Sequence, residues 1–174
     1  MSTKSHQLRP YFKDGVFSEK FVAITPGFVE AFSIGLIRYM GDSRTAATGE
    51  ERPLSCLFSV AEDANSAQIF GYFKDAFEYL GIDFENLGAK PLDVLKTALY
   101  DKDCDAGLAI RAHDDEIKIE VFERGDEVGG LEASLPGGVN FEGKVKFASH
   151  ALPIPQIAVN HIEHALNTEI GFSR

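Results

Sequence analysis

AGLAIRAHDDEIKIEVFE, residues 106–123, is the stretch of sequence that decides the fold. Apolar side chains alternate with smaller or polar ones on both sides of the polar triplet 113–115. The apolar positions are Leu108, Ile110, Ile117, Ile119 and Val121. A period of two is typical of strands that bury one face and leave the other wet. The stretch therefore predicts two strands, 106–112 and 116–123, joined by a tight turn.

Helical spacing of apolar residues predicts four helices around this hairpin. Thr25 is expected to cap the first helix, which begins at Pro26 and runs to Met40, with Gly41 closing it. Glu30, Ser33 and Arg38 are expected on its polar side. The other helices are predicted from a cap at Asn65 or Ser66 to Gly81, from Pro91 onward, and over 153–171.

Further strands are predicted at 54–60 and 144–149, and Asp14-Gly15 between apolar flanks is a hairpin signal. No internal repeat or linker divides the chain, so a single domain over residues 1–174 is expected. This order of elements predicts an α+β fold. We expect an antiparallel or mixed sheet of about five strands, covered mainly on one face by three to four helices.

Composition excludes several classes of partner. Seventeen basic residues against 27 acidic ones give a net charge of −10. A nucleic acid or an anionic membrane surface is therefore not expected as a partner, whereas a cationic partner fits. The apolar stretch 21–37 is rather short for a bilayer span and contains Pro26, Gly27 and Glu30.

The cellular compartment is inferred from the cysteines and the N-terminus. Cys56 and Cys104 are the only cysteines and form no CxxC pair, so a reducing, cytoplasmic setting is expected. Residues 1–15 lack the apolar stretch of a signal peptide.

Two ligand-binding patterns are present only in part. Asp101, Asp103 and Asp105 have the spacing of a calcium loop, but Ala106 and Ala112 stand where that loop needs glycine and a bidentate glutamate. GVNFEGKV, residues 138–145, resembles a phosphate-binding loop but lacks the final hydroxyl residue. No cofactor is expected.

Nucleophile patterns are equally incomplete. AFSIG, residues 31–35, surrounds Ser33 within a helical stretch rather than a strand-turn-helix elbow. Cys56 lies in an apolar strand and is expected to be a core residue. Cys104, among aspartates, is expected to have a raised pKa.

Histidines offer the one metal hypothesis. His161 and His164 are three residues apart on a predicted helix, near enough to share a metal, and His150 lies upstream as a third candidate ligand. The helical wheel puts His164 nearly opposite the buried arc and His161 near its edge. A metal-assisted or cofactor-free small-molecule enzyme is the alternative function that these residues suggest.

Aromatic residues suggest the main functional hypothesis. The chain has 14 Phe and no Trp. Phe70, Phe73 and Phe77 share the apolar face of one predicted helix, whereas Tyr72 and Tyr79, seven residues apart, share another face. With Phe84 nearby, and with Arg38 and Tyr39 as further candidates, these residues suggest an interface or a ligand cleft. We therefore expect a non-catalytic small-ligand-binding or regulatory domain, and a homodimer, with a small apolar ligand or a protein as partner.

Overall fold

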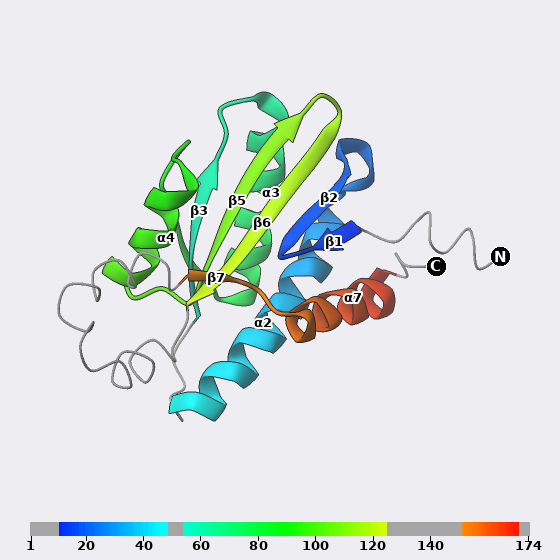
Figure 1. The fold of residues 1–174 in the computed structure, drawn as a ribbon. Helices are drawn as coiled ribbons and strands as arrows, with labels where there is room; N and C mark the ends of the chain where they lie inside the picture. Colours follow the sequence, from blue (N-terminus) through cyan, green and yellow to red (C-terminus); the bar gives the residue numbers. More distant parts are fainter. Residues whose placement is uncertain (1–10, 49–53, 125–150, 171–174) are drawn as a thin grey trace.

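A mixed seven-stranded sheet forms the centre of the molecule, seen here in a computed structural model that describes residues 11–48, 54–124 and 151–170 (Figure 1). Its path is β1-β2-β6-β5-β3-β4, and β7 also pairs with β6. β3 runs parallel to β4 and β5, and the other pairs are antiparallel. The strands are β1 (Tyr11–Lys13), β2 (Val16–Lys20), β3 (Ser55–Val60), β4 (Asp83–Asn86), β5 (Ala106–His113), β6 (Glu116–Arg124) and β7 (Ala151–Pro153).

Helices cover the sheet mainly on one face. The described helices are the short 3-10 turn η1 (Phe21–Ala23), α2 (Pro26–Thr48), α3 (Ala64–Leu80), α4 (Leu92–Asp101) and α7 (Gln156–Ile170). α2, α3 and α7 pack on the face formed by alternate residues of β3 such as Cys56 and Phe58. α4 packs Leu95 and Leu99 against the opposite face. The expected α+β architecture is confirmed, with more strands than the approximate count.

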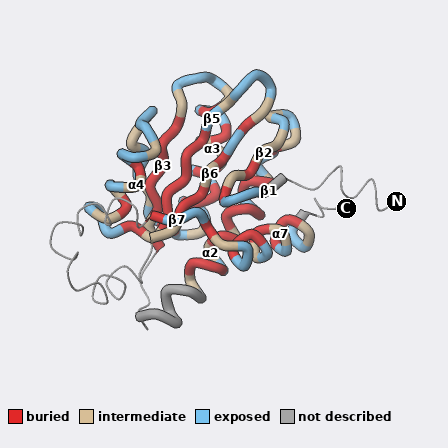
Figure 2. Tube along the Cα trace, in the orientation of Figure 1, coloured by how far each residue is buried: buried red, intermediate tan, exposed pale blue. Residues whose placement is uncertain are grey.

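The hairpin of residues 106–123 is confirmed as the centre of the sheet. β5 and β6 pair from Ala106 opposite Glu123 to His113 opposite Glu116. Asp114 closes the turn with φ 57°, a left-handed conformation that aspartate tolerates better than most residues. The inward-facing apolar residues of both strands are buried, as the tube in Figure 2 shows. In β6 the alternation reflects burial of one strand face. The expectation of a wet second face is wrong for the first half of β5, because α4 covers Ala109 from the other side.

The first long helix differs from its prediction in two respects. α2 continues through Gly41 to Thr48. A helix-interior glycine costs only about 1 kcal/mol, so Gly41 does not end a helix that tertiary contacts hold. Ser33, expected on the polar side, is fully buried, and its hydroxyl donates to the Val29 carbonyl oxygen at 2.8 Å. That local bond satisfies the hydroxyl inside the core.

Two other details extend or correct the sequence analysis. β4 (Asp83–Asn86) was not predicted, and the strand predicted at 144–149 lies outside the described residues. Among the described helices, none is both long enough and apolar enough to cross a membrane.

α3 is capped by Asp63 rather than by Asn65 or Ser66. The Asp63 carboxylate accepts hydrogen bonds from the Ser66 backbone N–H and from the Ser66 hydroxyl, both at 2.8 Å. Partial burial opposes ionisation of this carboxyl, but the Ser66 bonds outweigh that effect and hold its pKa below the ordinary value. Gly81, as predicted, ends the helix, with φ 78°.

This cap gives a pH-dependent prediction. Because the pKa of Asp63 is lower in the folded chain, its contribution is fully present above its unfolded pKa of about 4 and is lost as the pH falls through the folded pKa. We expect Asp63→Ala to lower the free energy of unfolding by about 1 kcal/mol at pH 7. In urea unfolding followed by circular dichroism, this deficit should shrink as the pH falls from 7 to 3. Asp63→Asn, which caps without titrating, is the control, and an undiminished deficit of the alanine variant at pH 3 would contradict the assignment.

Candidate functional site

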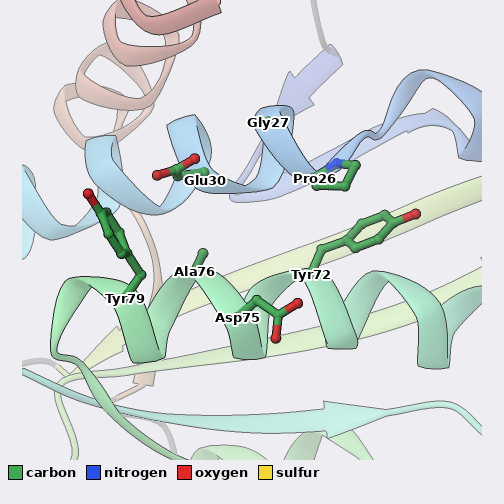
Figure 3. A pocket seen from close by; sticks show the side chains of 7 residues that line it. All are labelled: Pro26, Gly27, Glu30, Tyr72, Asp75, Ala76 and Tyr79. Carbon is green, nitrogen blue, oxygen red and sulfur yellow. The ribbon is translucent and has the colours of Figure 1, made fainter.

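A groove between α2 and α3 brings together two of the predicted site residues, Tyr72 and Tyr79. The groove has a volume of about 390 Å³. Its lining residues come from the first turns of α2 and from the second half of α3 (Figure 3): Pro26, Gly27, Glu30, Tyr72, Asp75, Ala76 and Tyr79. The volume falls in the range of small-molecule and side-chain binding sites.

Helical periodicity explains the α3 wall. Tyr72, Asp75, Ala76 and Tyr79 are separated by three, four and seven residues, which places them on one helical face. Ala76 is buried and forms the floor, whereas Tyr79 is 79% exposed. The Gln68 side-chain amide donates to the Tyr72 hydroxyl at 2.6 Å. This bond restrains the Tyr72 ring before any ligand arrives.

The start of α2 forms the facing wall. The Thr25 hydroxyl accepts a hydrogen bond from the Phe28 backbone N–H at 3.1 Å, as predicted for an N-cap. Pro26 and Gly27 follow, and Glu30 lies one turn further along. In Figure 3 the Tyr79 ring rises from α3 toward α2 on the side where Glu30 lies, and Pro26 lies at the Tyr72 end. Gly27 lies between Pro26 and Glu30 and has no side chain to fill the groove.

The groove is negatively charged. Glu30 and Asp75 are both exposed, and within the described residues neither carboxylate forms an ion pair or a side-chain hydrogen bond. Lys74, the nearest cation in sequence, pairs instead with Glu78 at 3.6 Å. The described lining thus combines aromatic rings with carboxylates and holds no cysteine, serine or histidine. This chemistry is suited to binding a ligand.

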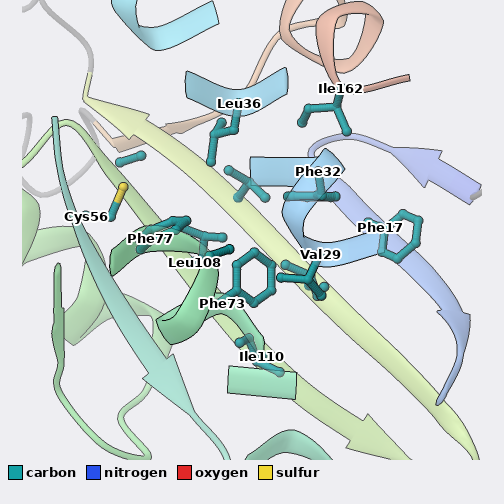
Figure 4. Packing of buried hydrophobic residues seen from close by; sticks show 14 of the residues in the cluster. Phe17, Val29, Phe32, Leu36, Cys56, Phe73, Phe77, Leu108, Ile110 and Ile162 are labelled. Atoms are coloured by element: carbon teal, nitrogen blue, oxygen red, sulfur yellow. The ribbon is translucent and has the colours of Figure 1, made fainter. Parts of the chain in front are cut away.

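The phenylalanines of α3 serve the core instead. Phe73 and Phe77 are fully buried and face the sheet (Figure 4). Phe73 meets Phe32 of α2 edge-on at 5.8 Å between ring centroids, and Phe77 meets Phe58 of β3 at 5.3 Å. Of the α3 aromatic residues, the two tyrosines therefore line the groove, and these phenylalanines contribute interior packing.

Arg38 and Tyr39 lie elsewhere, beside α7 and the end of β6. Arg38 pairs with Glu169 at 3.6 Å, and both side chains are largely exposed. The Tyr39 hydroxyl donates to Glu123 Oε1 at 2.6 Å, and its ring centroid lies 6.1 Å from that of His161. Tyr39 is buried and packs α2 against its neighbours, whereas Arg38 is exposed and forms a surface ion pair with α7.

Phe84, the remaining candidate, lies on the edge strand β4. Its ring is 6.0 Å from that of Phe77 and 6.1 Å from that of Phe58, so it extends the core to the edge of the sheet. It also lines a second hollow of about 410 Å³, together with Cys56 and Cys104. Phe84 and the tyrosine-lined groove are thus separate features.

Both cysteines are poor nucleophiles in this setting. Burial raises the pKa of the Cys56 thiol far above its ordinary value, and the Asp105 carboxylate raises it further. Burial likewise raises the pKa of Cys104, against a hydrogen bond with the Ser55 side chain that lowers it. The sequence prediction for Cys104 is confirmed, although desolvation rather than the aspartates is the main cause. Neither thiol is activated.

The three aspartates near Cys104 have separate structural environments. Asp101 ends α4, Asp103 has φ 55° and pairs with Arg124, and Asp105 Oδ2 accepts a hydrogen bond from the Ser55 backbone N–H at 2.9 Å. β5 begins directly afterward, where a calcium loop would continue. The side chains of Asp103 and Asp105 thus link the connection between α4 and β5 to neighbouring strands.

The histidine hypothesis stays a prediction. His161 is half-buried and His164 is exposed on α7, as the helical wheel indicated, whereas His150 lies outside the described residues. Across the described ranges, no three side chains of the metal-binding types gather at one place.

Sequence reasoning missed the carboxylates of the groove as site residues. Asp75 lies three residues after Tyr72 and four before Tyr79, so helical spacing alone places it with them. Glu30 was expected only on a polar helix side. Its approach to α3 depends on how two helices pack, which no local pattern encodes.

The chain matches no protein-family model, and no curated protein sequence is detectably similar to it.

Proposed function

We propose that this chain is a non-catalytic binding domain that holds its ligand in the groove between α2 and α3. The observation that carries the proposal is the pair of tyrosines that line one 390 Å³ groove, Tyr79 being 79% exposed. Tyrosine supplies a large, rigid contact surface at low entropic cost and is enriched where binding energy concentrates. A reducing, cytoplasmic setting is part of the proposal, because both cysteines are free thiols and pack in different core clusters.

Fragment binding followed by NMR tests the proposal. A library of neutral aromatic and aliphatic fragments is titrated into the ¹⁵N-labelled full chain. We expect the largest amide shifts at residues 26–30 and 72–79. Tyr79→Ala should weaken the best fragment about fivefold or more, since truncated aromatic anchors cost over ~1 kcal/mol. Val22→Ala, which removes another exposed apolar side chain, is the matched control.

Two results would count against this function. If fragments bound only at the hollow beside Phe84, the binding site would be assigned to that hollow instead of the groove. If no fragment bound anywhere, the proposed ligand-binding role would be wrong.

The homodimer remains a prediction, checked by sedimentation velocity at two protein concentrations. A dimer that Tyr79→Ala dissociates would assign the groove to a second copy of the chain.

A further inference from the structure

We infer that the ligand of this groove is an arginine-bearing, extended segment of a partner protein. The inference rests on the proposed function and deepens it, because it names the class of ligand. Four observations carry it: the length of the groove, two carboxylates that no described basic residue pairs with, the exposed Tyr79 ring beside Glu30, and the aromatic and proline surface of Tyr72 and Pro26 at the other end.

The spacing of the tyrosines sets the size of the occupant. Seven helical residues separate Tyr72 from Tyr79, which at 1.5 Å per residue is about 10 Å along α3. An extended peptide rises about 3.3 Å per residue, so about three residues span this distance. A single small cation would fill one end and leave the other ring exposed.

The charge of the groove selects a cation. Glu30 on α2 and Asp75 on α3 lie on facing helices, and among the described residues no basic side chain neutralises either one. The whole chain adds a net charge of −10, which draws a basic partner toward it and repels an acidic one. A basic segment thus gains from the local carboxylates and from the field of the protein.

The aromatic ring favours arginine over lysine. A guanidinium group is planar, binds a carboxylate through two parallel hydrogen bonds, and stacks on an aromatic face. Tyr79 and Glu30 offer both contacts at the same end of the groove (Figure 3). A flanking apolar residue of the segment would then cover Pro26 and the Tyr72 ring, which Gln68 restrains.

Peptide titration of the full chain tests the inference. The probe is acetyl-Ala-Arg-Ala-amide, and its matched control replaces arginine with citrulline, which keeps the shape but removes the charge. We expect amide shifts at residues 26–30 and 72–79 with the arginine peptide, and at least fivefold weaker binding of the citrulline peptide. Because exposed ion pairs are worth up to ~1 kcal/mol each, Glu30→Gln with Asp75→Asn should weaken the arginine peptide about five- to tenfold.

The control variant carries the same change in net charge outside the groove. Asp101→Asn with Asp114→Asn alters exposed carboxylates at the end of α4, on the opposite face of the sheet, and at the hairpin tip. It should change the affinity less than twofold at 0.15 M salt, where charges beyond about 8 Å are largely screened. An equal loss in both double variants would overturn the local site in favour of a general effect of net charge.

Other outcomes separate this inference from the proposed function. If the citrulline and arginine peptides bound the groove equally well, the ligand would not need a positive charge. The inference would then be wrong, whereas the proposed binding role would stand. If methylguanidinium bound as tightly as the peptide, the ligand would be a free small cation rather than a protein segment. If fragments bound the groove and the arginine peptide did not, this inference would be wrong and the proposed function would stand. If neither fragments nor peptides shift the groove amides, both ideas fail.

Discussion

Replacing Phe58 with alanine is expected to lower the free energy of unfolding by about 3–5 kcal/mol. Phe58 is fully buried in β3, at the centre of a set of aromatic contacts from α3 and β4. Its ring centroid lies 5.1 Å from Phe70, 5.3 Å from Phe77 and 5.6 Å from Phe73. Truncation removes the buried ring surface, leaves a cavity and breaks all of these tilted and edge-on contacts.

Urea unfolding of the full chain, followed by far-UV circular dichroism, measures this loss. Phe58→Leu is the companion variant, with a smaller expected loss of about 1–2 kcal/mol because the residual cavity is smaller. It keeps the test decisive if the alanine variant does not fold. Tyr79→Ala, at an exposed position, should change stability by no more than about 0.5 kcal/mol. A loss below about 1 kcal/mol in Phe58→Ala would show that the aromatic core is packed differently.

The sheet could be predicted from the sequence wherever burial repeats locally. The alternation at Ile117, Ile119 and Val121 identified β6, because each of these side chains meets the same core face. β4 escaped prediction because Asp83–Asn86 is a short, largely exposed edge strand, in which only Phe84 packs inward. A pattern requires at least two buried positions, and this strand supplies one.

Of the candidate groove, the sequence predicted only the two tyrosines on α3. Tyr72 and Tyr79 share a face of one helix, and that relation is written in their spacing. Glu30 precedes them by more than forty residues, and its place in the groove follows from the packing of α2 on α3. Arg38 and Tyr39 lie apart from the groove because they are on the side of α2 that meets α7, and their role in an interface stays a prediction.

Gly35→Ala is expected to destabilise the fold by about 1–2 kcal/mol, although alanine is the better helix former. α2 crosses α7 at this glycine. A Cβ atom built on Gly35 would lie 2.5 Å from Ile162 Cα, 2.7 Å from the His161 carbonyl oxygen and 2.9 Å from the Ile162 nitrogen. All three are backbone atoms, so relief requires movement of a whole helix rather than of a side chain. Overpacking usually costs about 1–3 kcal/mol, and contacts with backbone atoms favour the upper part of that range. The gain of about 1 kcal/mol in helix propensity offsets only part of this cost.

The same substitution at Gly41, two turns further along α2, should have the opposite sign. A Cβ atom there meets nothing within 4 Å, so Gly41→Ala should raise the free energy of unfolding by about 0.5–1 kcal/mol through helix propensity alone. Comparing the free energies of unfolding of the two variants in urea separates the steric cost at the helix crossing from the effect of helix propensity. If Gly35→Ala were also stabilising, the crossing of α2 and α7 would have to be wider than described. The groove residues of α2 lie about one and a half to two and a half turns before this crossing, so a wider crossing would also change how that wall meets α3.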